Sequence, residues 1–338
     1  MRKKQKHNES HTARIRRAAA LAAVLAFLPL GAAAEPHPTL KPMVTAEPAK
    51  EPETPARDAE GFLEEDGEFI WEDDEGGLWM YLSRSLQVVI RRQKDTKIPL
   101  VWFETDIRTR GEERFRTVQT NPEKPGKSYR FPYDIAKDEG FVLGFTDDFF
   151  AERMKKDKNG KSQVPGIIIR EGQIISSRTY TKRRNYLPNL AMMIQYPDGR
   201  LEVCECYEHT AEELLEAGAL NVFSFGPVLV RDGEINEQMY SGSYRSIEPR
   251  HALGMVEPGH YVLLSIQGRR KDSKGTMLQR VAEMMKERGV TQALNLDGGN
   301  TMAIMFRGRM LNKEAVYQGR QFVRSVTSLI GIGKTSIP

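Results

Sequence analysis

The sequence predicts an α+β protein, with a mixed, largely antiparallel sheet and a few packed helices in a single large domain. Three observations predict this class. Short runs rich in β-branched and aromatic residues recur along the chain after residue 77. Turn signals such as Pro197-Asp198-Gly199 and Arg231-Asp232-Gly233 separate several of these runs, which is typical of hairpins. Helical periodicity is confined to two short segments, so strands outnumber helices without regular alternation.

Residues 1–34 have the layout of a secretory signal. A basic stretch ends at Arg17, an uncharged apolar run extends from Ala18 to Leu30, and Ala32-x-Ala34 is the expected cleavage site. The apolar run is shorter than the roughly 20 residues that a stable transmembrane helix needs. We therefore expect cleavage and an extracytoplasmic, secreted protein. The alternative is an uncleaved leader that tethers the protein, which would then contact the membrane through this segment alone.

The charge balance gives no indication of a nucleic-acid partner. The whole chain contains 50 Lys and Arg against 46 Asp and Glu, a formal net charge of +4. Seven of these bases and one of the acids lie in the leader, which leaves 43 bases, 45 acids and a net charge of −2. A nucleic-acid-binding domain requires a basic face on its folded surface. We therefore expect no nucleic acid among the partners.

Two segments separate the leader from the main domain. Residues 35–60 are rich in Pro, Glu and Ala with almost no large apolar side chains, which predicts an extended linker. Residues 61–97 contain an acidic run around Trp71 and a first strand. The acidic run lacks the ordered ligand spacing of a calcium loop, so a solvated segment is expected there. Residues 98–338 form the main domain, in which we find no second linker.

Eleven runs are predicted as strands from their composition and from the turn signals that bound them. They are residues 78–90, 99–108, 140–145, 166–175, 190–196, 201–206, 222–230, 260–266, 293–296, 302–306 and 325–331.

Two segments are predicted as helices. Thr210 and Glu213 form a capping box ahead of a short helix over residues 212–217, which a glycine ends. The second helix is predicted over residues 277–288, because four apolar residues recur at helical spacing before Gly289. Its methionines are expected to pack in the core rather than contact a cofactor.

Cys204 and Cys206 are two residues apart in a predicted strand, so their side chains share a face. They form either a strained bridge in an oxidising compartment or two unpaired thiols that pack. The sequence shows no Cys-x-x-Cys and no cysteine-histidine cluster, so no zinc site of the usual kind is predicted. His209, just before the capping box, is expected at the surface.

The most informative segment reads ALNLDGGNTM over residues 293–302. Its apolar strand delivers Asn295 and Asp297 to its carboxyl end, and Gly298 and Gly299 then let backbone amides approach a ligand closely. A carboxylate beside exposed amides suits acid-base work or the orientation of a polar substrate. On this motif alone, a tight turn in which Asp297 caps its own backbone is an equally good interpretation.

The run Asn-Leu-Asp-Gly-Gly at residues 295–299, followed by polar residues and Met302, resembles the signature of the phosphodiester glycosidase family. Further blocks resemble that family in the right order. They are residues 144–150, 165–175, 211–215, 223–233, 249–254 and 267–278. The resemblance covers roughly residues 98 to 333. It implies an exported hydrolase that cleaves glycosyl-1-phosphodiester bonds, with a carbohydrate phosphodiester or a cell-wall glycan as its partner.

The resemblance and the chemistry of the bond together select the site residues. Cleaving a glycosyl phosphate places positive charge on the sugar, so the site needs a carboxylate near the sugar and cations near the phosphate. Asp297 and Asp148 are the expected catalytic carboxylates. Arg250 and Arg269 are the expected cations, and the alternative for each is a structural ion pair. The expected substrate-binding residues are Asp147, Gly226, Gln267, Ser273, Asn295, Gly298, Gly299, Asn300 and Thr301.

The chain also departs from the family pattern. Residues 146–148 read Thr-Asp-Asp in place of Asn-Gly-Gly, Gln267 replaces an acid, and Asn300 replaces a glycine. A backbone-lined pocket would thereby become a carboxylate-lined one. These departures leave open a non-catalytic envelope module of the same fold that binds anionic glycans. His251, where the family has threonine, is expected to pack or to line the substrate rim.

A third interpretation is metal-assisted phosphodiester hydrolysis. Asp147, Asp148 and Asp297 would then supply oxygen ligands to calcium or magnesium. We predict no cofactor, and a divalent cation is not favoured.

Overall fold

The computed structural model describes residue 40 and residues 43–148, 166–178 and 190–337. The leader, the start of the linker and parts of the blocks at 144–150 and 165–175 lie outside the described residues. Leu40–Pro338 form one compact unit. Within the described residues, no helix combines the length and the apolar character that crossing a membrane requires.

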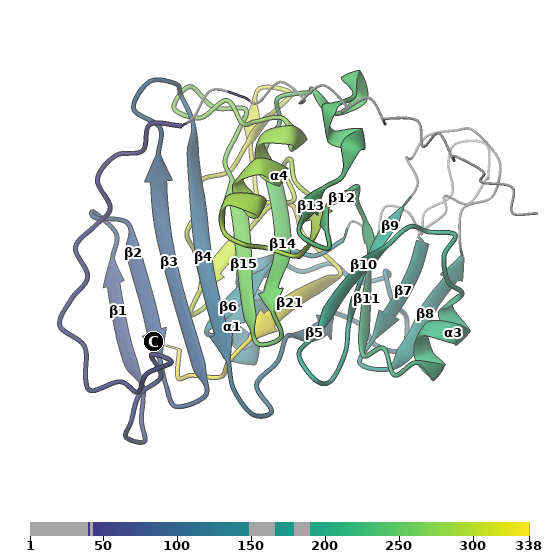
Figure 1. Cartoon of the computed structure of the whole chain (residues 1–338), viewed down its shortest axis with the longest axis horizontal. Coiled ribbons are helices and arrows are strands. Elements are labelled where there is room, and N and C mark those ends of the chain that lie inside the picture. Colours follow the sequence, from purple (N-terminus) through teal and green to yellow (C-terminus); the bar gives the residue numbers. More distant parts are fainter. Residues whose placement is uncertain (1–39, 41–42, 149–165, 179–189, 338) are drawn as a thin grey trace, which may run out of the picture. The chain divides into compact units, whose positions relative to one another are not determined.

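The largest sheet has nine strands (Figure 1), and each hydrogen-bonded pair of neighbours is antiparallel. In spatial order the strands are β1 (Phe69–Asp73), β2 (Leu78–Leu82), β3 (Leu86–Lys94), β4 (Val101–Thr109), β15 (His260–Ile266), β14 (Arg250–Glu257), β16 (Gln292–Leu296), β12 (Val228–Arg231) and β13 (Glu234–Ile235).

Two five-stranded antiparallel sheets accompany it. One contains β10 (Leu201–Cys204), β9 (Ala191–Gln195), β11 (Asn221–Phe225), β7 (Gly166–Arg170) and β8 (Gln173–Arg178) in that order. The other contains β18 (Arg309–Met310), β17 (Ile304–Phe306), β6 (Leu143–Phe145), β21 (Ser328–Ile332) and β5 (Arg116–Gln119). A small hairpin pairs β19 (Val316–Tyr317) with β20 (Arg320–Gln321).

The described helices each pack on one sheet. Helix α4 (Leu278–Glu287) lies against β12, β13 and β14 of the nine-stranded sheet, as Figure 1 shows. Helix α1 (Pro132–Glu139) packs on β6, β17 and β21, and α3 (Ala211–Glu216) packs on β7 and β8. Two short 3₁₀ turns, η1 (Glu237–Tyr240) and η2 (Gly242–Tyr244), precede β14.

Both faces of the nine-stranded sheet are buried at its centre. Successive side chains of a strand point to opposite faces. Phe103 and Leu263 accordingly belong to a core cluster that also contains residues of both five-stranded sheets. Their neighbours Trp102 and Leu264 belong to a second cluster, which the apolar side of α4 completes. The central strands are therefore apolar on both faces and hold the ends of β14 and β16 rigidly.

The structure confirms the α+β class and the antiparallel character of the sheets. The capping box is also confirmed, because the Thr210 side chain accepts from the Glu213 amide at 3.2 Å and the Glu213 carboxylate accepts from the Thr210 amide at 2.8 Å. The predicted runs 78–90 and 222–230 each divide into two strands. The second divides at the cis peptide Gly226–Pro227.

Seven of the eight acids in the acidic run are solvent-exposed and Asp73 is half-buried, which agrees with the predicted solvated segment. Its second part is also paired in the sheet, because residues 69–94 form β1, β2 and β3, and β3 pairs with β4 along nine residues. Its acids form ion pairs within the fold: Glu72 with Arg307 at 2.9 Å, and Asp74 with Arg309 at 2.9 Å. Arginines far away in the sequence therefore pair with two acids of a run that is itself solvent-exposed.

Candidate active site

Strand β16 brings two polar residues to one end of the nine-stranded sheet. It pairs with β14 on one side and β12 on the other, and Leu294 and Leu296 are fully buried. Asn295 is 3% exposed, and its side-chain nitrogen donates to the carbonyl of Gly226 at 2.9 Å. Its Oδ1 is buried and has no donor among the described residues. A ligand or water that donated to this oxygen would remove the free-energy cost of leaving it unsatisfied.

The chain turns directly after β16, from Asp297 to Thr301. The Gly298 carbonyl accepts from the Thr301 amide at 3.1 Å. Gly299 has a φ of +59°, a left-handed conformation that glycine adopts without strain. The half-buried Asp297 donates from its amide to the carbonyl of Asp147 at 3.2 Å. The turn is therefore fixed by its backbone, and the role of the Asp297 carboxylate remains a prediction.

Three glycines pack tightly against the backbone of residues 248–250, and we call them the glycine cradle. A Cβ at Gly298 would lie 2.3 Å from a carbonyl oxygen of that segment. A Cβ at Gly275 would lie 2.4 Å from a second carbonyl, and one at Gly268 would lie 2.7 Å from a backbone nitrogen. Only glycine fits at such distances. The cradle thus places the start of β14 directly against the turn after β16.

The guanidinium of Arg269 links the cradle to the turn. Its Nε donates to the Glu248 carboxylate at 2.7 Å, and its Nη1 donates to the side-chain oxygen of Asn300 at 2.8 Å. It also lies 5.8 Å from the ring centroid of Tyr317, which is within cation–π range. Because the Arg269 side chain is 32% exposed, it can still contact an anionic ligand.

Arg250 starts β14 next to Arg269. Its Nη2 donates to the Ser246 carbonyl at 2.6 Å, and its Nε donates to the Thr276 carbonyl at 3.1 Å. Burial lowers the pKa of Arg250 to about 10; Glu248 acts to raise that pKa, and the positive charge of Arg269 lowers it further. An anion bound between the two guanidinium groups would relieve this repulsion.

One predicted carboxylate and both predicted cations meet around this turn. The ideal Cβ position at Gly298 lies 3.2 Å from the Cα of Arg250, and that at Gly299 lies 3.6 Å from Nη1 of Arg269. Asp297 immediately precedes these two glycines. The backbone of Arg250 and the guanidinium of Arg269 therefore lie against the turn that Asp297 begins.

Asp147 and Asp148 belong to a different, buried group. Asp148 accepts from Nη2 of Arg170 at 2.6 Å and from the Ser224 amide at 2.8 Å, and its side chain has no exposed surface. Asp147 accepts from the Ser328 hydroxyl, and it lies 3.5 Å from the same Arg170 nitrogen. We call these five residues the Arg170 cluster. The geometry favours a structural role for both carboxylates over the expected carboxylate-lined pocket.

Arg170 was not selected from the sequence, because its partners lie 22 and 23 residues away. An arginine at the end of an apolar strand is nevertheless a signal of a buried pair. Burial, followed by the negative charge of Asp148, raises the pKa of Asp147, and Arg170 opposes that shift.

Comparison with known proteins identifies the family. A family model described as phosphodiester glycosidase matches residues 139–333, which is more than half of the 338 residues. The chain belongs to the phosphodiester glycosidase family. The matched range contains the turn after β16, the glycine cradle and both arginines.

Two proteins are similar to this chain, one in sequence and one in structure. The SPbeta prophage-derived uncharacterized protein YomE of Bacillus subtilis (strain 168) is 29% identical over 119 residues, which cover 35% of this chain and 18% of that protein. The zebrafish N-acetylglucosamine-1-phosphodiester alpha-N-acetylglucosaminidase catalytic domain, auto-inhibited by its pro-peptide, aligns with a TM-score of 0.53 and 18% identity. That alignment covers 87% of this chain and 88% of the zebrafish chain, so the two share a fold.

Two predicted substrate-binding residues are buried and hydrogen-bonded within the protein. The Gln267 side-chain oxygen accepts from the Lys313 amide at 2.7 Å. The Ser273 hydroxyl donates to the Gln267 carbonyl at 2.7 Å and accepts from the Val101 amide at 3.0 Å. Both residues hold the loop that carries Arg269, and contact with a substrate remains a prediction.

Glu248 and Arg324 join the site although the sequence analysis did not select them. Glu248 orients Arg269, and Arg324 donates to the Thr301 hydroxyl at 3.0 Å. Glu248 lies two residues before Arg250, so an acid this close to a predicted site cation could have indicated that Glu248 belongs to the site. Arg324 lies 23 residues from Thr301, and no local pattern indicates that contact.

Both cysteines are buried, and they form no disulfide with each other. Burial raises the pKa of Cys204 to about 12. Cys204, Glu208 and the exposed His209 have ligand atoms within 4.8 Å of one another, a cysteine-histidine cluster that the sequence analysis did not predict. The Glu208 carboxylate is already bound by Arg231 at 2.8 and 2.9 Å, so we assign no metal there.

His251 packs in the core rather than at a substrate rim. It has no exposed surface, its Nδ1 lies 3.0 Å from the Ser265 hydroxyl, and its ring lies edge-on to Phe145 with centroids 5.8 Å apart. Burial lowers the pKa of His251 to about 3, although the backbone of Thr146 acts to raise it. A neutral, buried imidazole of this kind is not a proton shuttle.

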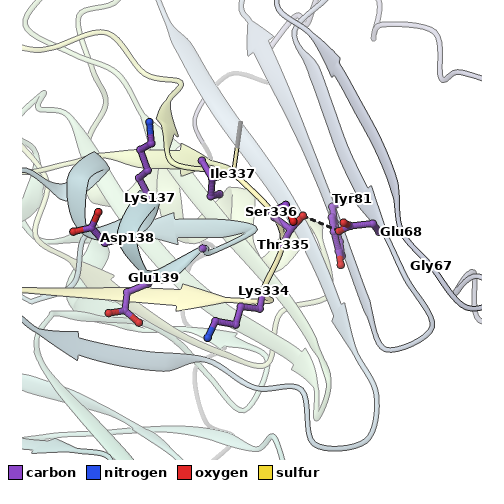
Figure 2. Close-up of a pocket in the computed structure, with 11 residues that line it drawn as sticks. Gly67, Glu68, Tyr81, Lys137, Asp138, Glu139, Lys334, Thr335, Ser336 and Ile337 are labelled. Atoms are coloured by element: carbon purple, nitrogen blue, oxygen red, sulfur yellow. Dashed lines mark hydrogen bonds between the residues drawn. The ribbon is translucent and has the colours of Figure 1, made fainter.

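A separate cavity of about 870 Å³ has no predicted site residue in its lining. Figure 2 shows that its lining comes from the end of α1, the C-terminal residues 334–337 and Tyr81. The Thr335 hydroxyl donates there to the Glu68 carboxylate at 2.7 Å. Charges of both signs line this cavity, so it is less suited to a phosphate than the turn beside Arg250 and Arg269.

Proposed function

We propose that this protein is an exported hydrolase that cleaves glycosyl-1-phosphodiester bonds in a cell-envelope polymer or glycan. The observation that carries the proposal is that the turn after Asp297 lies against the backbone of Arg250 and the guanidinium of Arg269. Family membership supports glycosidase chemistry. The basic and apolar leader supports an extracytoplasmic location, with membrane contact through that leader alone if it is not cleaved.

We propose a step for each group. Arg250 and Arg269 bind the phosphate, the latter through the part of its side chain that is still exposed. As the bond from the anomeric carbon to the phosphate oxygen breaks, the phosphate leaves with the electron pair and positive charge develops on the sugar. Asp297 stabilises that charge and orients the water that attacks the anomeric carbon. Because phosphate is a good leaving group, electrostatic positioning matters more than protonation of the leaving oxygen.

The test is turnover on defined substrates. The folded protein is incubated with α-N-acetylglucosamine 1-phosphodiesters and with glycosyl phosphates isolated from cell walls. We expect free sugar and a phosphomonoester, with ¹⁸O from labelled water in the sugar because the sugar C–O bond breaks. Label in the phosphate instead would indicate P–O cleavage. Release of no sugar from any of these substrates would refute the proposal.

A second candidate is a non-catalytic module that binds anionic glycans in the same place. The Arg170 cluster favours this candidate. Asp147 and Asp148 stand where the family has two glycines, and both carboxylates already contact Arg170. Saturable glycan binding without turnover would support this candidate. Turnover that Asp297→Asn abolishes would exclude it.

Metal-assisted hydrolysis has weaker support. Among the described residues, no group of three or more His, Cys, Asp or Glu with ligand atoms within 4.8 Å of one another includes Asp147, Asp148 or Asp297. Two of these carboxylates bind Arg170 instead. We therefore expect turnover to survive exhaustive chelation, and loss of turnover that calcium or magnesium restores would revive the metal mechanism.

A further inference from the structure

Positive charge is concentrated in the three segments that border the turn after β16. Residues 245–250, 269–276 and 313–324 together contain nine Lys and Arg but only three acids. The chain after the leader has a net charge of −2, so this concentration is a local feature. We call these three segments the cationic rim.

The three segments are neighbours in space. Residues 245–250 and 269–276 join through the bridge between Glu248 and Thr276. Nη1 of Arg270 donates to the Glu314 carbonyl at 3.0 Å, which joins the second segment to the third. The third segment contacts the turn itself, because the Asn300 side chain donates to the Ala315 carbonyl at 2.7 Å. The rim is therefore one continuous border of the site.

The acids of the rim neutralise only part of its charge. Glu248 pairs with Arg269 at 2.7 Å. Asp272 pairs with Arg270 at 2.9 Å and lies 3.6 Å from Lys313. The third acid is Glu314. Five cations of the rim are solvent-exposed, namely Arg245, Lys271, Lys274, Lys313 and Arg320.

The rim also presents aromatic rings. Tyr317, on the β19–β20 hairpin next to Arg269, is 44% exposed, and Phe322 is 39% exposed. Exposed rings interleaved with cations suit a ligand that alternates apolar sugar faces with negative charges. A single phosphate bound between Arg250 and Arg269 would not account for these exposed rings and cations.

We infer that the cationic rim binds phosphates of the repeat units adjacent to the bond that is cleaved, so the substrate is a linear polymer with a phosphodiester in every repeat. A polyanion bound by several cations releases its condensed counterions, which adds affinity that an isolated phosphodiester cannot gain. The assignment of a substrate rests on the proposed function. The affinity of the rim for a phosphodiester polymer does not, and it can be measured without turnover.

The binding test uses a fluorescent poly(glycerol phosphate) hexamer, a single glycerol phosphodiester and poly-glutamate. The rim variant is Lys271→Ser, Lys274→Ser and Arg320→Ser. Its control removes three exposed cations outside the rim, Lys50→Ser, Arg84→Ser and Lys286→Ser. We expect the wild-type protein to bind the hexamer at least about tenfold more tightly than the monomer at low salt, with log Kd rising as log salt rises. The rim variant loses that advantage and its salt slope falls by about 0.7 per lost contact, whereas the control keeps both.

Three binding results would overturn the inference. Equal affinity for monomer and hexamer would show that adjacent phosphates are not bound. Equal behaviour of the rim variant and its control would show that the binding surface lies elsewhere. Affinity for poly-glutamate equal to that for the hexamer would show that the rim attracts any polyanion.

Cleavage separates the two proposals. N-acetylglucosamine is joined through a 1-phosphodiester to one or to six glycerol phosphate units, and kcat/KM is measured for both. A higher kcat/KM for the longer substrate, lost in the rim variant and kept in the control, supports both proposals. Equal values for the two lengths would overturn the polymer substrate and leave the proposed function standing. Rim-dependent binding of the hexamer without cleavage of either would overturn the proposed function and reduce the rim to a binding surface.

Discussion

Asp297 begins the turn that Arg250 and Arg269 flank, and its charge is what the proposed chemistry uses. Asp297→Asn keeps the volume and much of the hydrogen bonding, so we expect the melting temperature to hold and turnover to fall by about a hundredfold. Turnover of an α-N-acetylglucosamine 1-phosphodiester and thermal unfolding measure the two effects. Asp66→Asn is the control, because its carboxylate is 91% exposed beside Arg84. Near-normal turnover in Asp297→Asn would leave Asp297 as a capping residue.

Arg269 acts through the shape of its guanidinium as well as its charge. It bonds Glu248 and Asn300 from two different nitrogens, which the single ammonium group of lysine cannot reproduce. We expect Arg269→Lys to weaken phosphodiester binding about tenfold and to leave binding of the free sugar unchanged. Calorimetry with both ligands measures this difference, with Arg84→Lys as the control. An equal loss for charged and uncharged ligands would indicate a structural ion pair.

His251 makes the folded state sensitive to acid. Burial lowers its pKa from 6.5 to about 3, so the unfolded chain takes up a proton near pH 6.5 while the folded protein does not until about pH 3. Its contribution to stability is present above pH 6.5 and is lost as the pH falls towards 3. The raised pKa of Asp147 acts in the opposite direction, because its contribution is lost as the pH rises. A variant at position 251 therefore isolates the histidine.

We expect His251→Asn, which keeps a polar partner for Ser265, to lose less stability than the wild type between pH 7 and pH 4. Urea midpoints at several pH values in this window measure the comparison. Parallel losses in the two proteins would show that other groups cause the acid sensitivity.

At the scale of elements, the glycine cradle sets the distance between β14 and the turn after β16. A Cβ at Gly298 would meet a carbonyl oxygen at 2.3 Å, whereas one at Gly242 would meet nothing within 4 Å. Neither residue has a positive φ, so Gly298→Ala and Gly242→Ala differ in space alone. We expect Gly298→Ala to lose about 1–3 kcal/mol of stability and most of its turnover. Gly242→Ala should change neither, and equal effects would contradict the cradle.

The elements that the sequence predicted are those with local signals. Thr210 and Glu213 cap a helix within one turn, and the apolar spacing of Leu278, Val281, Met284 and Met285 marks the buried side of α4. Strand β14 was not predicted as a strand, because its centre is buried on both faces and shows no alternation of apolar and polar residues. Helix α1 was missed although a proline opens it and Gly140, at φ +66°, ends it.

The site residues also divide into those with a local signal in the sequence and those without one. Asp297 and its glycines were found because they follow one another in a single motif. The reason for the glycines was not predictable, because it is the approach of residues 248–250, about 50 positions earlier in the chain. The Arg170 cluster joins four strands or strand ends, and no local pattern specifies such a set. The sequence showed the acidic run but not the distant arginines that pair with Glu72 and Asp74.

For the whole molecule, the Arg170 cluster ties separate sheets together. Arg170 ends β7 in one five-stranded sheet, while Asp148 follows β6 and Ser328 starts β21 in the other. The Asp147 carbonyl then accepts from the Asp297 amide at the end of β16, which belongs to the nine-stranded sheet. One buried charge network therefore connects all three large sheets at the base of the site.

Asp148→Asn tests whether this residue holds the fold or acts on the substrate. The substitution leaves the buried Arg170 guanidinium, 1% exposed, without its closest counter-charge. Removing one partner of a buried ion pair costs about 3–5 kcal/mol, so we expect a large fall in the unfolding midpoint. Activity per folded molecule should change much less than in Asp297→Asn. If Asp148→Asn instead unfolds like the wild type and is inactive, the carboxylate acts on the substrate and the structural assignment is wrong.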